Sequence, residues 1–215
     1  MEQRRYCQGA QHALVLLPGA QMHPADVEQA GLPALLQRSG VALDLLVPDL
    51  HLDPTGRSDA CARLAREVLA PLATRYRRLW LAGISLGGLL ALRHAQTLPK
   101  GLHGLCLFAP YAGSRLTTNA IARAGGLQAW QATAAQQADP EFALWLDLRM
   151  GRPDLPTFIG WGRGDRFTAS MAALAGQLPQ AWRQEVDGGH DWDAWRPLWR
   201  SALAWIDAQD EGPQP

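Results

Sequence analysis

Residues 81–90 read LAGISLGGLL and place Ser85 between Gly83 and Gly87. The apolar residues 78–83 before the serine predict a buried β-strand, and residues 86–97 after it predict a helix. Glycine in the interior of either element costs roughly 0.5–1 kcal/mol relative to alanine, so these glycines indicate a sharp turn between strand and helix. The pattern G-x-S-x-G at such a junction is typical of a nucleophile elbow, which exposes a serine hydroxyl at the carboxyl end of the strand. The alternative is a glycine-rich turn that contains a serine without a catalytic role.

Short apolar runs bounded by turn residues recur on both sides of this turn. Each is too short for a typical helix, so we predict further strands at 12–18, 41–48, 103–110, 156–162 and 181–188. Helical patterns lie between and after them, at 24–38, 58–75, 168–177 and 191–208. This alternation predicts an α/β fold, a mostly parallel sheet of six to seven strands with helices on both faces.

One interval between predicted strands is longer than a single crossover helix needs. About 45 residues separate Pro110 from Pro156, and many of them are alanine, glutamine and tryptophan. This composition predicts two or so helices over one edge of the sheet. We therefore expect one domain over residues 1–215, with a small helical cap inserted at 111–155.

A serine hydroxyl is a weak nucleophile until a base accepts its proton. His190 lies in VDGGHDWDAW (186–195), on the loop after the last predicted strand, from which it could reach the edge where Ser85 lies. His23 follows the first predicted strand and is the closest rival, although lining a pocket or facing solvent suits it better. We therefore predict His190 as the base.

The base needs an acid that orients its ring. Asp165, in GRGDRF (162–167), follows the penultimate predicted strand and precedes His190 by 25 residues. Asp49, after the second strand, is an alternative, but the chain order serine, aspartate, histidine favours Asp165. The aspartates next to His190 in sequence suit capping of the turn and the final helix.

Acyl transfer also needs an oxyanion hole, two backbone N–H groups that bind the charge developing on the attacked carbonyl. Leu86, directly after the serine, is predicted to supply one donor. The loop LLPGAQMHP (16–24) is predicted to supply the other from Ala20 or, less favourably, from Gln21. The same loop could equally be a simple strand-to-helix turn.

Composition restricts the partners and the compartment. Lysine plus arginine and aspartate plus glutamate number 20 each, and without a basic stripe among aromatic residues we expect no nucleic-acid partner. No run reaches the roughly 18 apolar residues of a membrane span, so we expect no membrane partner. Cys7, Cys61 and Cys106 are scattered without metal-ligand spacing, which predicts no metal site and favours a reducing, cytoplasmic location. The sequence gives no guide to the oligomeric state.

Five segments, in order, resemble the motifs of the α/β-hydrolase superfamily, and in particular its small serine esterases: LLPGAQ, VPDL, GISLGG, GRGDRF and GGHDWDAW. The resemblance implies a triad of Ser85, Asp165 and His190, with Ala20 and Leu86 at the oxyanion hole. It implies two-step acyl transfer from a small-molecule acyl substrate without a cofactor. Two departures stand out: Pro18 occupies a position where many members have histidine, and the N-terminal hairpin of the family is expected to be absent, which leaves six strands.

Substrate identity depends on the cap and the loops. Five residues are candidate substrate contacts, and each aromatic one could equally belong to the core: Tyr111, Trp130, Trp145, Trp192 and His23. Arg115, Arg123 and Arg163 leave a phosphorylated substrate open, although we favour a small or medium acyl ester. The alternatives are a thioesterase or acyltransferase with the same triad, a peptidase, and a non-catalytic ligand receptor on this fold.

Overall fold

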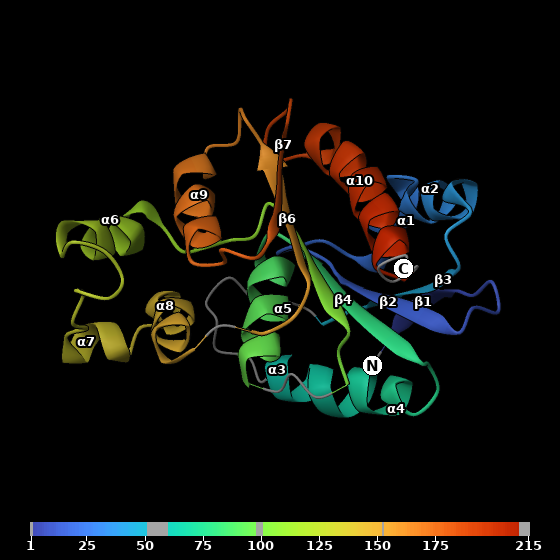
Figure 1. Ribbon diagram of the computed structural model, residues 1–215, viewed down its shortest axis with the longest axis horizontal. Helices are drawn as coiled ribbons and strands as arrows, with labels where there is room; N and C mark the ends of the chain where they lie inside the picture. Colours follow the sequence, from blue (N-terminus) through green and yellow to red (C-terminus); the bar gives the residue numbers. More distant parts are fainter. Residues whose placement is uncertain (1, 51–59, 98–100, 152, 211–215) are drawn as a thin grey trace, which may run out of the picture.

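The six runs predicted as strands, together with one further strand at the N-terminus, form one seven-stranded sheet in the computed structural model, which describes residues 2–50, 60–97, 101–151 and 153–210 (Figure 1). The spatial order is β1-β3-β2-β4-β5-β6-β7, and every neighbouring pair is parallel except β1 with β3. The mostly parallel α/β fold is thus confirmed. The strands are β1 Gln3–Tyr6, β2 His12–Leu17, β3 Leu43–Pro48, β4 Arg78–Ile84, β5 Gly104–Phe108, β6 Thr157–Gly162 and β7 Trp182–Val186.

The predicted six to seven strands are confirmed as seven, so the minimal six-stranded version expected from the lack of an N-terminal hairpin is wrong. Strand β1, with the sequence QRRY, pairs antiparallel with β3 at the edge of the sheet. Its two arginines are exposed, so it lacks the apolar run that marks the buried strands. Charged residues on an edge strand also disfavour pairing with other chains.

Helices cover both faces of the sheet. Figure 1 shows α1 (Pro24–Gln29), α2 (Leu32–Ser39) and α10 (Trp192–Asp210) on one face, and α5 (Leu86–Thr97) and α9 (Thr168–Gly176) on the other. The predicted helices at 86–97, 168–177 and 191–208 are confirmed to within two residues.

Two predicted helices differ in detail from the observed ones. The segment 24–38 forms two helices because Gly31 adopts the left-handed conformation (φ 80°) and Pro33 lies in the first turn of α2, where proline is tolerated. The segment 58–75 is helical from residue 60 to 73 as α3 (Ala60–Arg63), η1 (Leu64–Leu69, a π-helical stretch) and α4 (Ala70–Ala73). Its predicted start at 58–59 lies outside the described residues.

The long interval between β5 and β6 contains α6 (Arg115–Arg123), α7 (Ala134–Gln137) and α8 (Pro140–Met150). Helix α8 packs against α5, where Asp147 accepts a hydrogen bond from Arg93 at 3.0 Å, and α6 contacts α9. The helices therefore flank one side of the sheet (Figure 1), and a capping role for 111–155 stays a prediction.

An aromatic cluster holds α10 against the sheet. Trp199 packs against Phe108 with ring centroids 5.9 Å apart, and Trp205 packs against Phe158 at 6.0 Å and Trp80 at 5.5 Å. Because α10 begins two residues after His190, this packing also anchors the loop that carries the predicted base. No helix in the described part of the chain is both long and apolar enough to cross a membrane.

Candidate active site

Ser85 lies at the junction of β4 and α5 in a strained backbone conformation, with φ 52°. Side chains at Gly83 and Gly87 would destroy this turn, because a Cβ on Gly83 would overlap the backbone of Gly87, and one on Gly87 would overlap the backbone of Leu17. The Ser85 N–H donates to the carbonyl of Phe108 at 2.9 Å, which ties the turn to β5. The local structure is the predicted elbow.

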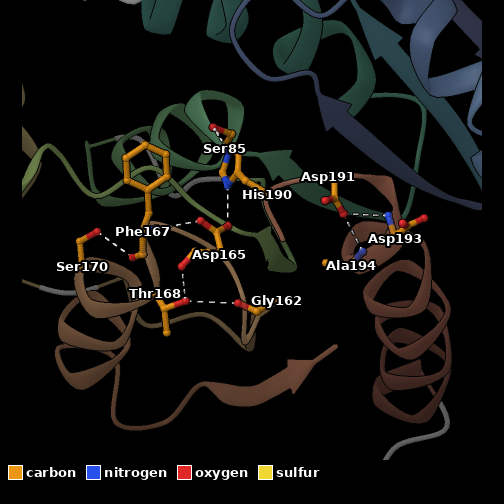
Figure 2. Close-up of polar contacts among 10 residues, drawn as sticks. All are labelled: Ser85, Gly162, Asp165, Phe167, Thr168, Ser170, His190, Asp191, Asp193 and Ala194. Atoms are coloured by element: carbon orange, nitrogen blue, oxygen red, sulfur yellow. Dashed lines mark hydrogen bonds and ion pairs between the residues drawn. The ribbon is translucent and has the colours of Figure 1, made fainter. Parts of the chain in front are cut away.

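His190 lies between Ser85 and Asp165, although the three residues come from distant parts of the chain (Figure 2). Its Nε2 atom is 2.9 Å from Ser85 Oγ, and its Nδ1 atom is 2.6 Å from Asp165 Oδ2. An ionised carboxylate only accepts hydrogen bonds, so Nδ1 carries the hydrogen and Nε2 is free to accept the serine proton. The structure thus brings together all three residues predicted as a triad.

Asp165 is held at the N-terminus of α9 with its side chain buried. Its Oδ1 atom accepts the N–H of Phe167 at 2.8 Å, and its carbonyl accepts the hydroxyl of Thr168 at 2.6 Å. The positive end of the α9 dipole stabilises the carboxylate. Backbone bonds from Arg163 to Val186 (2.8 Å) and from Gly164 to Gly188 (2.9 Å) join this loop to the one that carries His190.

Two aromatic rings fix the imidazole of His190. Phe167 packs edge-on against it with centroids 5.4 Å apart, and Trp195 does so at 5.3 Å. The His190 side chain keeps 19% of its surface exposed, so its orientation is constrained while its reacting edge stays accessible.

The alternative base and the alternative acid lie next to each other, and neither is the hydrogen-bond partner of His190. His23 Nδ1 lies 3.3 Å from Asp49 Oδ2, whereas His190 is bonded to Asp165. Asp191 accepts the N–H groups of Asp193 and Ala194 at 3.1 and 3.4 Å, and so caps α10 as predicted (Figure 2).

The loop after β2 passes directly beside the elbow. A Cβ on Gly19 would lie 3.4 Å from the Ile84 carbonyl and 3.5 Å from Ser85 Cβ, so the two backbones are in close contact. Ala20, Gln21 and Leu86 line the same cavity as Ser85. This brings the predicted oxyanion donors to the nucleophile.

Strained backbone concentrates at this edge of the sheet. Among the described residues other than glycine, a positive φ occurs at Gln21 (59°), Ser85 (52°) and Ala109 (44°). The three residues follow the carboxyl ends of β2, β4 and β5, which are adjacent strands. Such strain is kept where the surrounding structure enforces it, and it is enriched at functional sites.

The cavity over Ser85 has a volume of about 390 Å³, within the range of small-molecule sites. Besides the elbow, the loop after β2 and His190, its described lining consists of Met22, Tyr111, Arg166, Phe167 and Trp195. No group of three or more histidine, cysteine, aspartate or glutamate side chains among the described residues could hold a metal ion.

Of the five predicted substrate contacts, Tyr111 lines this cavity. Trp130 and Trp145 are each 2% exposed and belong to the core, where Trp130 stacks on Phe142 and Trp145 donates to the Ala112 carbonyl at 2.8 Å. Trp192 lines a neighbouring cavity that shares residues 20–22 with the first. His23 is the N-cap residue of α1, with 64% of its side chain exposed.

Glu141 of α8 orients Tyr111. The Tyr111 hydroxyl donates to Glu141 at 2.5 Å, and the same carboxylate accepts from Ser114 N (3.1 Å) and Thr117 Oγ1 (2.8 Å). Burial and this hydrogen bond raise the pKa of Tyr111. Burial acts to raise the pKa of Glu141, but the hydrogen bonds from Tyr111 and Ser114 outweigh it and hold that pKa below its usual value. The Tyr111 hydroxyl is thus held in place by its hydrogen bond to Glu141.

Three residues that line the cavity are not predicted from the sequence: Met22, Arg166 and Phe167. No spacing pattern marks these residue types. The available signal is adjacency, because Arg166 and Phe167 directly follow Asp165 on a loop that must reach the site.

A mostly parallel sheet with a serine elbow at its carboxyl edge, followed by an aspartate and a histidine from later loops, defines an α/β-hydrolase architecture. The sequence model of the alpha/beta hydrolase family matches residues 14–212, and the chain belongs to that family.

Solved structures share this fold at low sequence identity. The fluorophosphonate-binding serine hydrolase F of Staphylococcus aureus is 14% identical with a TM-score of 0.68, over 91% of this chain and 83% of that one. The monoacylglycerol lipase of Paleococcus ferrophilus is 15% identical with a TM-score of 0.67, over 96% and 98%. An S-formylglutathione hydrolase of Agrobacterium tumefaciens is 16% identical with a TM-score of 0.66, over 94% and 85%. A search of curated protein sequences found no match.

Proposed function

We propose that this protein is a serine hydrolase that cleaves a small or medium acyl ester through an acyl-enzyme on Ser85. The observation that carries the proposal is the continuous hydrogen-bonded series from Ser85 Oγ through His190 to the buried Asp165. A receptor that only binds a ligand has no need of all three groups in this geometry.

In the first step His190 Nε2 accepts the hydroxyl proton as Ser85 Oγ attacks the ester carbonyl. Asp165 stabilises the resulting imidazolium and keeps the hydrogen of Nδ1 directed toward itself. The negative charge that develops on the carbonyl oxygen is bound by the N–H groups of Leu86 and Ala20. The imidazolium then gives its proton to the leaving alcohol, which departs and leaves the acyl group on Ser85.

In the second step water replaces the alcohol. His190 takes a proton from the water as its oxygen attacks the acyl carbon, and the same oxyanion donors bind the second tetrahedral intermediate. Its collapse returns the proton to Ser85 Oγ and releases the carboxylic acid. Neither step calls for a metal or an organic cofactor.

The neighbouring structures support an ester substrate, since their names include a monoacylglycerol lipase and a ferulic acid esterase. A cavity of about 390 Å³ suits a small or medium acyl group. We further propose that residues 1–215 form one domain with 111–155 as a small cap, and that the protein acts in the cytoplasm. Free thiols at Cys7, Cys61 and Cys106 fit a reducing compartment.

Intact mass measurement after treatment with a fluorophosphonate tests the proposal. Wild type should gain one adduct, and Ser85→Ala should gain none while keeping the circular dichroism spectrum of the wild type. A panel of esters, thioesters and alcohol acceptors then separates esterase from thioesterase and acyltransferase. Absence of an adduct on folded wild type would contradict the proposal and favour a ligand receptor.

A further inference from the structure

Arg166 is a cationic residue in a cavity without acidic lining. It lines the cavity over Ser85, and none of the other described lining residues is an aspartate or a glutamate. Among the described residues, no carboxylate lies within ion-pair distance of the Arg166 guanidinium. Its side chain is exposed, so its charge faces solvent at the mouth of the site.

The guanidinium of Arg166 is held next to the triad by an aromatic contact. Its Cζ atom lies 4.7 Å from the centre of the Phe167 ring, a cation–π arrangement. This contact adjoins the active site, because the Phe167 ring also packs edge-on against His190 at 5.4 Å and against Tyr111 at 5.7 Å. Stacking on a ring face leaves the N–H donors at the guanidinium edge available.

The other arginines near this region differ from Arg166. Arg163, three residues earlier on the same loop, donates to Asp187 at 2.7 Å and to the Glu185 carbonyl at 3.2 Å. Arg196, which lines the neighbouring cavity, donates to the Ala30 carbonyl at 3.0 Å and lies 3.7 Å from Asp193 Oδ1. The N–H groups of these two arginines donate to other groups of the protein, whereas those of Arg166 remain available to a bound molecule.

We propose that Arg166 binds a carboxylate of the substrate and thereby selects esters that carry one. A single guanidinium presents two parallel N–H groups that match one carboxylate, and a monoanion balances its charge. The apolar walls formed by Met22, Tyr111 and Trp195 receive the hydrocarbon part between this carboxylate and the scissile ester. This inference rests on the proposed hydrolase activity and narrows its substrate class.

Two pairs of chromogenic esters test the inference and tell which side of the ester bears the charge. The first pair is para-nitrophenyl hexanoate and the mono-para-nitrophenyl ester of adipic acid, with the carboxylate on the acyl side. The second is para-nitrophenyl butyrate and its meta-carboxy derivative, with the carboxylate on the leaving group. The readout is the ratio of kcat/KM for the charged ester to that for the neutral ester, which cancels general damage to the triad.

Arg166→Met should lower this ratio about tenfold or more in at least one pair, as expected for loss of a charge-assisted hydrogen bond. Arg166→Lys should keep part of the preference. Arg115→Met is the matched control, because it removes another exposed arginine charge, at the first turn of α6 and outside the described lining of this cavity, and it should leave the ratio unchanged. An equal ratio in wild type and Arg166→Met for both pairs would overturn the inference.

A binding readout covers the case in which neither ester pair is turned over. Adipate should slow fluorophosphonate labelling of Ser85 more than adipamide does, and Arg166→Met should remove that difference. Equal protection by the two compounds in wild type overturns the inference while Ser85 labelling leaves the hydrolase proposal intact. Failure of wild type to be labelled at all counts against the hydrolase proposal itself.

Discussion

Two buried aspartates lie at opposite ends of the parallel sheet. Asp165 follows β6 at the carboxyl edge and is 5% exposed, whereas Asp44 is the second residue of β3 at the amino edge and is 1% exposed. Asp44 accepts the N–H groups of Gln8 and Ala10 at 2.7 and 3.1 Å and the Tyr76 hydroxyl at 2.8 Å. Both carboxylates are therefore paired with donors, as buried charges must be.

What differs is the kind of donor. Asp44 is bound by two backbone groups and a phenol, and burial together with the hydrogen bond to Asp44 raises the pKa of Tyr76 to about 12. Burial acts to raise the pKa of Asp44 as well, but the hydrogen bonds from Gln8 and Tyr76 outweigh it and lower that pKa. Asp165 is bound by a histidine whose other nitrogen lies 2.9 Å from Ser85 Oγ. A buried carboxylate thus occurs both at a structural position, Asp44, and at the candidate catalytic position, Asp165. The two positions are distinguished by the groups that donate hydrogen bonds to the carboxylate.

Asp165→Asn should produce the largest effect, a fall in kcat/KM of roughly 10³–10⁴-fold with little change in thermal stability. The amide N–H₂ would favour the imidazole tautomer with hydrogen on Nε2, which cannot accept the Ser85 proton. Ester hydrolysis and differential scanning calorimetry measure the two quantities.

The control for this substitution is Asp49→Asn, which changes the alternative acid. It should retain kcat/KM, since Asp49 lies against His23. A loss of activity in Asp49→Asn, with Asp165→Asn active, would assign the acid role to Asp49.

The site at the carboxyl edge could be largely predicted from sequence because its residues sit in short local patterns. Gly83 and Gly87 mark the elbow, Asp165 follows the buried apolar strand β6, and His190 follows the predicted last strand, β7. Arg166 could not be predicted as a lining residue, since its placement depends on how the loop after β6 folds over Phe167.

The amino edge could not be predicted in the same way. The donors to Asp44 lie 32 to 36 residues away in the chain, in segments with no motif. Within the apolar run of β3, Asp44 gives no indication of its partners. Strand β1 escaped prediction for a related reason, because an exposed edge strand needs no apolar pattern. Local patterns thus predict the strands and the elbow, whereas contacts between distant segments require the structure.

Asp44→Ala should lower the free energy of unfolding by about 3 kcal/mol, because it leaves two backbone N–H groups and a phenol without their acceptor. The folded fraction should still be labelled by a fluorophosphonate at the wild-type rate. Asp44→Asn is the matched variant, since its amide oxygen can still accept the backbone N–H groups, and it should cost less. Equal losses in the two variants would mean that charge, and not acceptor geometry, matters at this position.

Tyr76→Phe should give the smallest effect, and one that depends on pH. The pKa of Tyr76 is about 12 in the folded state and about 10 in the unfolded state, so its contribution to stability is complete below pH 10 and is lost as the pH rises toward 12. Wild type should therefore exceed Tyr76→Phe by about 1 kcal/mol at pH 9, and the difference should shrink by pH 11.5. Denaturant unfolding of both proteins at the two pH values measures it, and the contributions of other titrating groups cancel in the difference. A difference that stays constant between the two pH values would contradict a raised pKa of Tyr76 in the folded state.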